Sequence, residues 1–350
     1  MPRFSHDELL EFGEQLLSSA GIPRGDSHLV GRLLVKADLH GYPGHGISRI
    51  PSYVSRIRAG LIRIRERPRV LREGKTTAVI DGNHYIGQVI AYEGMNLTIR
   101  KAKEHGVGMV CLYRAGHVGR LADYVELAAE QGMIGMAAVS VGSGNIAPYG
   151  GMEPVAGTNP MAYAFPGRNG RHVIFDFATA AMSMGELQKK VSRGEAIAEG
   201  VMLDGHGKPT TDFSEFIGPP RGVINPFGGY KGSGLNLVTE ILGGILSGTG
   251  LGREWWDRGG AAINGVMLQA FCVEEFQPLD VFLDKVDELV AFVKSRKPAP
   301  GFKEVLFPGE MSRRRAERHL KDGIEFGEAA WTILIQCASD LGVEYSPKPL

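Results

Sequence analysis

Two histidines stand where an imidazole could move a proton during catalysis. His45 lies in a loop rich in glycine and proline over residues 40–51, and His117 follows an apolar segment expected to be a strand over 107–113. Functional sites of α/β sheets gather at the carboxyl ends of strands, and a histidine there can act as a general acid or base near neutral pH. On position alone, the alternative for each is a surface histidine in a loop or at a helix cap.

Arg49 follows His45 by four residues, and its planar guanidinium suits a carboxylate. If the two converged on one pocket, they would suit a small hydroxy or keto acid, because the arginine would hold the carboxylate while the histidine moved the hydroxyl proton. Asp176, in the segment FDFAT, is either a helix-start carboxylate or a ligand to ribose hydroxyls. Lys231 stands among glycines, where it either meets a phosphate or carboxamide or is an exposed helix-start lysine.

Charge and spacing argue against several other classes of protein. The 39 basic and 39 acidic residues give zero net charge, which provides no overall attraction to nucleic acid or anionic membrane. The run from Arg56 to Arg72 is interpreted as a solvated face over a short apolar stripe, with phosphate binding as the alternative. His40 and His45 are not joined by a cluster of Asp, Glu or Cys, so no metal is expected.

Cysteine usage and the apolar runs indicate a compartment. The three cysteines, Cys111, Cys272 and Cys337, form no CxxC pair and are typical of buried thiols in a reducing environment. The N-terminal MPRFSHDELLEF lacks the apolar stretch of a signal peptide. No apolar run reaches the roughly 18 residues that a membrane-spanning helix needs. We therefore expect a soluble, cytoplasmic protein with no membrane association.

The elements that must position these residues follow from hydrophobic periodicity. Helices are expected at the start of the chain, and strands alternate with helices from residue 76, which predicts an α/β core with a separate helical layer. Strands are expected near 76–80, 107–113, 133–141, 161–165, 173–177 and 266–274. Helices are expected near 88–105, 118–131, 185–193, 232–246, 281–294, 312–321 and 325–341. Residues 194–227 are interpreted as polar and rich in turns.

One segment resembles a dinucleotide fingerprint without its structural context. Gly142 to Ala147 fit the pattern G-x-G-x-x-A after the strand expected at 133–141. That motif requires a helix to begin there, because the helix N-terminus receives the pyrophosphate. Pro148, Pro154 and Pro160 prevent such a helix. A Rossmann cofactor domain is therefore not expected.

Seven segments together resemble the malate/L-lactate dehydrogenase family of type 2, which is distinct from the Rossmann-fold lactate and malate dehydrogenases. They are HGISRIPSYVSRIRAG, GHVGRLADYVELAAEQGMIG, IAPYGGMEPVAGTNPMAYAFP, FDFAT, HGKPTTD, GYKGSGLNLVTEILGGILSG and FPGE. The match follows the family's order over nearly the whole chain, from about residue 5 to residue 340. Within the family, the chain is most similar to the hydroxycarboxylate dehydrogenases.

The resemblance implies an α/β (α+β), non-Rossmann fold. A helical domain of residues 1–75, joined by C-terminal helices within 300–350, would pack with a mixed-sheet domain of residues 76–299 that binds NAD or NADP and carries the catalytic residues. The resemblance also implies a homodimer or larger homo-oligomer, and a small 2-hydroxy or 2-oxo acid as substrate.

Site residues are implied in the same way. His117 matches the family's acid/base histidine, His45 matches a histidine beside substrate and nicotinamide that is the proton donor in some members, and Arg49 matches the arginine that binds the substrate carboxylate. Cofactor contacts are implied at His45, Arg120, Leu121, Ala122, Phe175, Asp176, Phe177, Ala178, Thr179, Lys231, Glu310, Met311, Ser312 and Arg313.

The predicted function is NAD(P)-dependent hydride transfer between a small 2-hydroxy acid and its 2-oxo acid, with histidine acid/base catalysis. Gly44 precedes His45 where the family often has serine, and Arg114 to Gly116 replace a frequent Asn-Ser, so the sequence leaves the substrate open. One alternative is a reductase of cyclic imino acids of the Δ1-piperideine-2-carboxylate type. Another is a non-catalytic nucleotide-binding homologue, against which the presence of both histidines and Arg49 argues.

Overall fold

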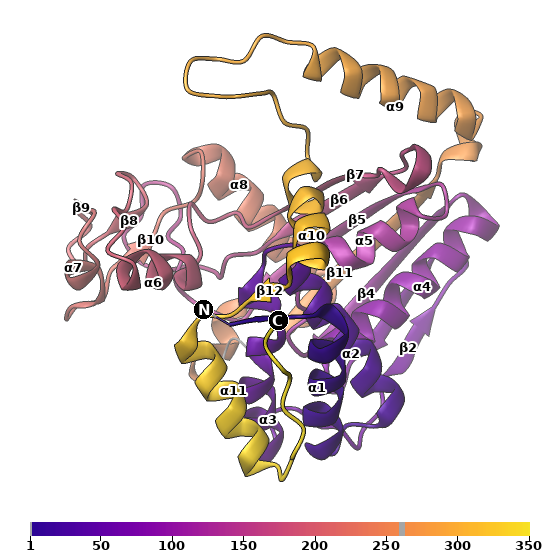
Figure 1. Ribbon diagram of the computed structural model, residues 1–350. Helices are drawn as coiled ribbons and strands as arrows, with labels where there is room; N and C mark the ends of the chain where they lie inside the picture. The colour runs from indigo at the N-terminus through magenta and orange to yellow at the C-terminus, as the bar shows by residue number, and fades with distance from the viewer. Residues whose placement is uncertain (1, 259–262) are drawn as a thin grey trace.

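A seven-stranded mixed sheet lies at the centre of the computed structural model, which describes residues 2–258 and 263–350 (Figure 1). Its order is β2 (Arg69–Glu73), β3 (Thr77–Asp81), β4 (Val107–Ala115), β11 (Asn264–Cys272), β5 (Met133–Val141), β6 (Met161–Phe165) and β7 (Val173–Phe177). Strands β3 and β4 run parallel, and the other neighbours pair antiparallel. The expected α/β fold with a mixed sheet is confirmed.

The central strands are apolar on both faces because helices cover both. Alternate side chains of β4 and β11, such as Leu112 and Leu268, join the main core beneath α4 (Gly87–His105) and α5 (Ala122–Ala129). Their neighbours Cys111 and Met267 face the opposite way, toward Leu242. That second face is covered by α8 (Tyr230–Thr239) and the π-helical turn η4 (Glu240–Ile245), where the expected helix 232–246 changes its hydrogen-bonding pattern.

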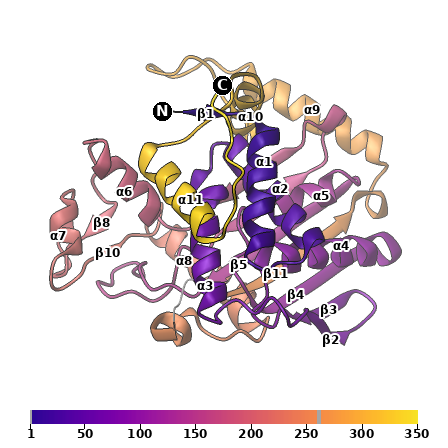
Figure 2. The same ribbon diagram turned by 60° about the horizontal axis from the view of Figure 1, so that its bottom comes forward.

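A helical layer packs beside this sheet and contains both ends of the chain. It comprises α1 (His6–Ser19), α2 (Arg24–Leu39), α3 (Ile50–Arg58), α10 (Glu310–Asp322) and α11 (Glu328–Asp340), with the turns η1 (Pro43–His45) and η2 (Ile47–Arg49) between α2 and α3. Strand β1 (Arg3–Phe4) pairs with β12 (Ile324–Glu325), and α11 contacts α3, so the two terminal segments lie side by side (Figure 2). The domain boundaries at residues 75 and 299 stay predictions. The edge strand β2 lies within the range 1–75.

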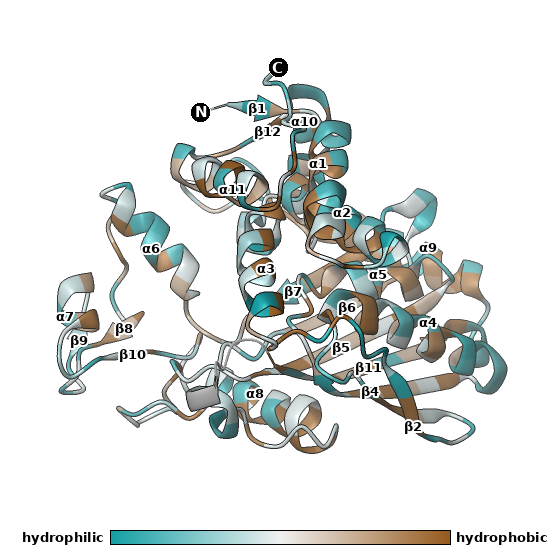
Figure 3. Ribbon diagram, turned by 90° about the horizontal axis from the view of Figure 1, so that it is seen from below, coloured by the Kyte–Doolittle hydropathy of each residue, from teal (hydrophilic) through white to brown (hydrophobic). Residues whose placement is uncertain are grey.

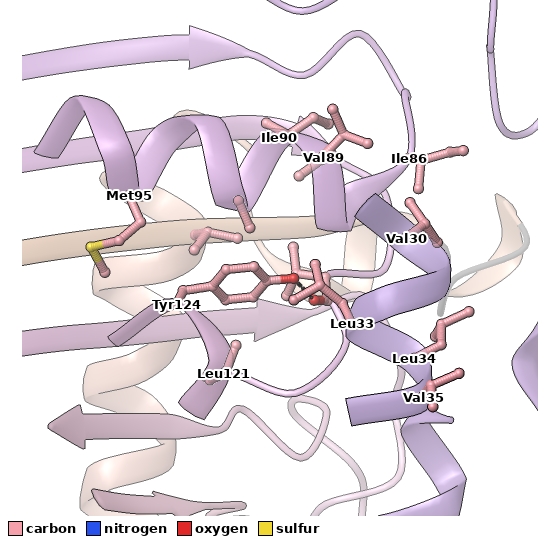
Figure 4. Close-up of a cluster of buried hydrophobic side chains, with 14 of the residues drawn as sticks. Val30, Leu33, Leu34, Val35, Ile86, Val89, Ile90, Met95, Leu121 and Tyr124 are labelled. Atoms are coloured by element: carbon pink, nitrogen blue, oxygen red, sulfur yellow. Dashed lines mark hydrogen bonds between the residues drawn. The ribbon is translucent and has the colours of Figure 1, made fainter. Parts of the chain in front are cut away.

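One continuous core joins the helical layer to the sheet. Val30, Leu33 and Leu34 of α2 belong to the same buried cluster as Val89 and Ile90 of α4 (Figure 4). Tyr124 of α5 lies in the same cluster, and its hydroxyl donates a hydrogen bond to the carbonyl of Val118. Fully burying one such aliphatic side chain contributes about 1.5–3 kcal/mol to stability. The packing therefore fixes α2, and the loop that follows it, relative to the end of β4.

A small lobe stands apart from the helical layer (Figure 3). It holds α6 (Met184–Ser192), β8 (Met202–Leu203), β9 (Pro209–Thr210), α7 (Phe213–Ile217) and β10 (Val223–Ile224) around its own cluster of buried residues, which includes Leu187, Met202 and Phe216. The stretch 194–227, interpreted as turn-rich, therefore contains short strands and a helix.

The remaining elements lie at the periphery. Helix α9 (Leu279–Lys294) has no fully buried residue, and it and the following connection extend away from the body (Figure 1). Short turns are η3 (Arg168–Gly170), η5 (Gly252–Arg258) and η7 (Val273–Glu275). All three cysteines are free thiols. Within the described residues, no helix is long and apolar enough to cross a membrane.

Candidate active site

The fold brings His45 and His117 face to face. Their ring centroids are 5.4 Å apart and their planes differ by 3°. His45 ends the turn η1 between α2 and α3, and His117 lies in the loop between β4 and α5. Two residues that are far apart in sequence thus meet where the helical layer touches the carboxyl end of β4.

A buried carboxyl group supports the loop that carries His45. Asp38, near the end of α2, is 3% exposed, and its Oδ2 accepts a hydrogen bond from the Ile47 amide at 2.8 Å. A Cβ added to Gly46 would lie 1.8 Å from Asp38 Oδ1, so only glycine fits between the loop and this carboxyl group. Burial raises the pKa of Asp38 to about 8, which favours the neutral acid near neutral pH.

The loop that carries His117 is held at several points. The Gly116 amide donates to the Tyr85 carbonyl at 3.1 Å, and the Val118 amide donates to Asn264 Oδ1 on β11 at 3.1 Å. The Val118 carbonyl accepts the hydroxyl proton of Tyr124. Residues on both sides of His117 are therefore fixed to the sheet and to α5, which limits movement of the imidazole.

Two buried side chains orient the His117 ring. The hydroxyl of Tyr53, on α3, lies 2.8 Å from Nδ1 of His117, and Gln88 Nε2 donates to the same hydroxyl at 2.7 Å. Tyr53 and Gln88 are 2% and 1% exposed, and burial raises the pKa of Tyr53 to about 12, so the phenol stays protonated. Nε2 of His117 has no partner among the described residues and remains available to a substrate.

Both imidazoles are held neutral by their surroundings. Burial, followed by the positive charges of Arg49 and Arg120, lowers the pKa of His45 to about 4. Burial, His45, Arg49 and Arg56 lower the pKa of His117 well below its ordinary value. Nδ1 of His45 is buried without a hydrogen-bond partner in the described chain. A neutral imidazole at pH 7 can accept a proton, as a general base must.

Arg49 stands beside this pair with most of its donors free. Its Nε donates to the Gly44 carbonyl at 2.5 Å, which fixes the side chain against the histidine loop. No carboxylate of the described residues pairs with its guanidinium. The structure thus gathers the three residues that the sequence singled out for proton transfer and carboxylate binding.

Several predicted cofactor residues meet at a cavity of about 280 Å³ between β7, α10 and the loop after α2. Its walls include Arg120, Phe175, Asp176, Met311, Ser312 and Arg313. Asp176 Oδ2 accepts from the Ala122 amide at 2.9 Å, and burial raises its pKa to about 6. Arg120 pairs with Asp123 at 2.6 Å and is 6% exposed. The cavity combines hydrogen-bonding groups with an aromatic wall, as a site for a nucleoside would require.

Other predicted cofactor residues are engaged in contacts within the protein. Glu310 is buried in ion pairs with Lys294 at 2.6 Å and Arg314 at 2.5 Å. Thr179 is fully buried, and its hydroxyl donates to the Thr158 carbonyl at 2.8 Å. Five more do not line this cavity. Leu121 and Ala122 are buried, Phe177 stacks on Phe175, Ala178 follows β7, and Lys231 is exposed on α8.

Sequence reasoning missed three residues of this site. Asp38 supports the histidine loop through Ile47, nine residues further on, whereas Tyr53 and Gln88 act on His117 through partners that lie far away in the chain. One signal was present for Tyr53, because it follows Arg49 by one helical turn on an amphipathic helix. Among the described residues, no group of three His, Cys, Asp or Glu side chains could hold a metal ion.

Comparison with known proteins identifies the family. A family model described as malate/L-lactate dehydrogenase matches residues 4–335. L-sulfolactate dehydrogenase of Methanothermobacter thermautotrophicus is 34% identical over 99% of this chain and 100% of its own. The structure of malate dehydrogenase from Pyrococcus horikoshii superposes with a TM-score of 0.90 at 32% identity, covering 98% of this chain and 97% of that one. Malate dehydrogenase from Entamoeba histolytica gives 0.92 at 29% identity, covering 98% and 99%. The chain belongs to the malate/L-lactate dehydrogenase family and is an oxidoreductase of the 2-hydroxyacid dehydrogenase type.

Proposed function

We propose that the protein interconverts a small 2-hydroxy acid and its 2-oxo acid, using NAD or NADP, with His117 as the general acid and base. The observation that carries this proposal is the arrangement at His117. Its Nδ1 is held by Tyr53 at 2.8 Å, its Nε2 has no partner among the described residues, and Arg49 stands nearby without a carboxylate. Arg49 could bind the carboxylate of a hydroxy acid, and Nε2 of His117 could take the proton of its hydroxyl group.

In the oxidation direction, the substrate carboxylate would bind Arg49, which places the C2 hydroxyl at Nε2 of His117. His117 would take the hydroxyl proton as the C2 hydride leaves, so that one C–H and one O–H bond break while the C2 carbonyl forms. The bound nicotinamide would supply the two-electron acceptor. Tyr53 would hold the imidazole in place throughout. General base catalysis of this kind contributes about 10²–10⁴-fold.

His45 would lie beside the substrate and the nicotinamide. Its buried, unpartnered Nδ1 indicates a polar group that a ligand would satisfy, which fits a bound cofactor or substrate. Because His45 stacks on His117, it is the alternative proton carrier, and the comparison of His45→Ala with His117→Ala distinguishes the two.

The cavity beside β7 fits the adenosine end of a nicotinamide dinucleotide. We propose that Asp176 accepts a hydrogen bond from a ribose hydroxyl. The walls of this part of the cofactor site would be Phe175, Met311, Ser312 and Arg313. Arg120, Leu121 and Ala122, at the start of α5, would approach the cofactor backbone. Lys231, Phe177, Ala178, Thr179 and Glu310 remain proposed contacts from the resemblance. Both NAD and NADP stay open.

We also propose that the protein works as a homodimer or larger homo-oligomer. Apolar side chains on α8 and η4 are strongly exposed, with Leu237, Ile241 and Ile245 at 45%, 53% and 51%. Such a contiguous apolar stripe on a soluble protein favours a partner surface. Sedimentation velocity at micromolar concentration tests this proposal, and a single monomeric species would contradict it.

A spectrophotometric panel tests the function. The panel offers 2-oxo acids and Δ1-piperideine-2-carboxylate with NADH and with NADPH, for the wild type and for His117→Ala. We expect turnover of a 2-oxo acid that falls at least 100-fold in His117→Ala, while NADH binding followed by fluorescence is kept. Turnover of the imino acid alone would favour the imino acid reductase. Binding of NADH without any turnover would favour a non-catalytic homologue.

A further inference from the structure

Strand β4 contains one extra residue shortly before His117. Leu112 pairs with Val266 of β11 and Ala115 pairs with Asn264, so three steps along β4 are matched by two along β11. On its other side, β11 pairs with β5 without any shift, which places the irregularity in β4. Such a β-bulge bends a strand and changes the direction of the side chains that follow it. The bulge therefore sets how the segment that carries His117 leaves the sheet.

Arg114 lies in this bulge with a left-handed backbone. Its φ is +49°, in a region that a residue with a Cβ enters at a cost and that glycine usually occupies. Of the five non-glycine residues with positive φ in the described part of the chain, three meet here, since Asn83 and His84 beside it have φ of 53° and 60°. The Arg114 carbonyl accepts from the His84 amide at 3.1 Å, and its amide donates to Thr249 Oγ1 at 3.2 Å. Backbone of this kind persists only where the surrounding contacts hold it.

A buried carboxylate fixes the side chain of Arg114. Its Nε and Nη2 donate to the two oxygens of Asp81 at 3.2 and 2.6 Å, and Asp81, at the end of β3, is 1% exposed. The guanidinium carbon also lies 4.6 Å from the centroid of the Tyr113 ring. Burial raises the pKa of Asp81, but the hydrogen bonds from Arg114 and from the Asn83 amide lower it more, so the carboxylate is charged at neutral pH. Two parallel bonds to one carboxylate fix the orientation of an arginine as a single bond does not.

The segments that follow β3 and β4 are packed too closely to move independently. A Cβ on Gly82 would lie 3.0 Å from the Arg114 carbonyl oxygen, and a Cβ on Gly116 would lie 2.5 Å from the Tyr85 carbonyl oxygen. The backbones are thus in contact at Arg114 and again two residues later. Because there is no free space between them, a change of conformation at Arg114 displaces the residues that follow, including His117.

We propose that Arg114 is a positioning residue for His117, because its pairing with Asp81 holds the left-handed bulge that directs the imidazole. This inference rests on the proposed function, since it assumes that His117 transfers the proton. Arg114 would touch neither the substrate nor the reacting atoms. The conformation of the backbone at position 114 would decide the activity, and the guanidinium would act only by holding that conformation.

Two substitutions at position 114 separate the backbone from the guanidinium. Arg114→Met removes the ion pair and keeps a Cβ that disfavours the left-handed region, whereas Arg114→Gly removes the ion pair and enters that region freely. Asp81→Asn weakens the pairing at nearly constant shape, and it takes the place of Arg114→Met if that variant does not fold. Lys101→Met is the control, because it breaks another buried ion pair, with Glu73 at 2.9 Å, at the opposite end of β3.

We expect Arg114→Met to lower kcat about 10- to 100-fold, with KM and NADH affinity within about threefold, because a displaced imidazole impairs proton transfer and not binding. Arg114→Gly should stay within about threefold of the wild-type kcat. Asp81→Asn should fall between these two, and Lys101→Met should match the wild type even if it unfolds at a lower temperature. An Arg114→Gly enzyme as slow as Arg114→Met would overturn the proposal, and so would an unchanged kcat in Arg114→Met or a loss expressed mainly in KM.

A measurement without turnover separates failure of this inference from failure of the proposed function. NMR of isotope-labelled histidines reports the ring nitrogens of His117, which are assigned from the signals missing in His117→Ala. The hydrogen bond between Nδ1 and Tyr53 should be present in the wild type and in Arg114→Gly and be weakened or lost in Arg114→Met. If this pattern is found but the wild type oxidises no 2-hydroxy acid, the proposed reaction alone is wrong. His117 signals that are unchanged in Arg114→Met would contradict the positioning role.

Discussion

Replacing Tyr53 with phenylalanine removes one oxygen atom and tests how His117 is controlled. The hydroxyl lies 2.8 Å from His117 Nδ1 and receives the Gln88 Nε2 proton at 2.7 Å. A base-competent His117 carries its proton on Nδ1 and leaves Nε2 free. The Tyr53 hydroxyl oxygen must then accept a hydrogen bond from the Nδ1–H group. The Tyr53 hydroxyl would in turn need an acceptor for its own hydrogen bond. Gln88 Oε1, which has no partner in the described chain, could accept that bond after a half-turn of the amide group.

The size of the effect follows from these contacts. A hydrogen bond to a neutral partner contributes about 0.5–1.5 kcal/mol, and one to a charged partner about 1.5–3 kcal/mol. The interaction therefore strengthens by about 1–1.5 kcal/mol as His117 becomes charged, which is about five- to tenfold in rate. Loss of control over the tautomer adds to this, so we expect kcat to fall about 10- to 50-fold with KM nearly unchanged. The pKa of His117 should fall further, because the imidazolium loses an acceptor.

The assay measures kcat and KM between pH 5 and 9 in both directions, with thermal unfolding recorded for each variant. Tyr85→Phe is the control, because it also removes a buried tyrosine hydroxyl, one that contacts Asp26 instead of a histidine. Gln88→Leu and the double variant complete a cycle, in which the two losses should be strongly non-additive. A Tyr53→Phe enzyme with at least a third of the wild-type kcat and an unchanged pH profile would refute the reasoning.

Two further predictions concern the loop that carries His45. Asp38 has its pKa raised to about 8, so the native state binds more protons than the unfolded state between pH 4 and 8, and Asp38 lowers stability as the pH rises through that window. Relative to Asp38→Asn, the wild type should therefore lose about 2–3 kcal/mol of unfolding free energy between pH 5.5 and 8 in urea titrations, and parallel pH dependences would disprove this. Gly46→Ala would place a Cβ 1.8 Å from Asp38 Oδ1 and should reduce kcat/KM more than tenfold, whereas Gly44→Ala, with open space around it, should be nearly neutral in the same assay.

Much of the sheet could be predicted because its central strands are long and apolar. The segments expected at 107–113, 133–141 and 266–274 became β4, β5 and β11, since helices bury both of their faces. Strand β2 was missed because Arg69–Glu73 is exposed throughout and carries the charges typical of a protected sheet edge. The strands of the small lobe were missed because they have two residues each and depend on packing around Phe216, whereas its helix α6 was expected at 185–193.

The residues of the candidate site likewise fall into those that the sequence could predict and those that it could not. His45, His117 and Arg49 could be found because their types and loop positions carry a chemical signal along the sequence. Tyr53, Gln88 and Asp38 could not, because a buried tyrosine, glutamine or aspartate on a helix has many structural explanations. Only the three-dimensional pairing shows that two of them form a hydrogen-bonded chain to His117.

The stacking of the His45 and His117 imidazoles limits how many protons the two rings can bind. With ring centroids 5.4 Å apart, two imidazolium ions would repel each other by about 3 kcal/mol at an effective dielectric constant of about 20. The second proton would therefore bind roughly a hundredfold more weakly than the first. The pair therefore takes up one proton far more readily than two. If the protein oxidises a 2-hydroxy acid as proposed, each turnover releases one hydroxyl proton, which is the number that the pair can readily take up.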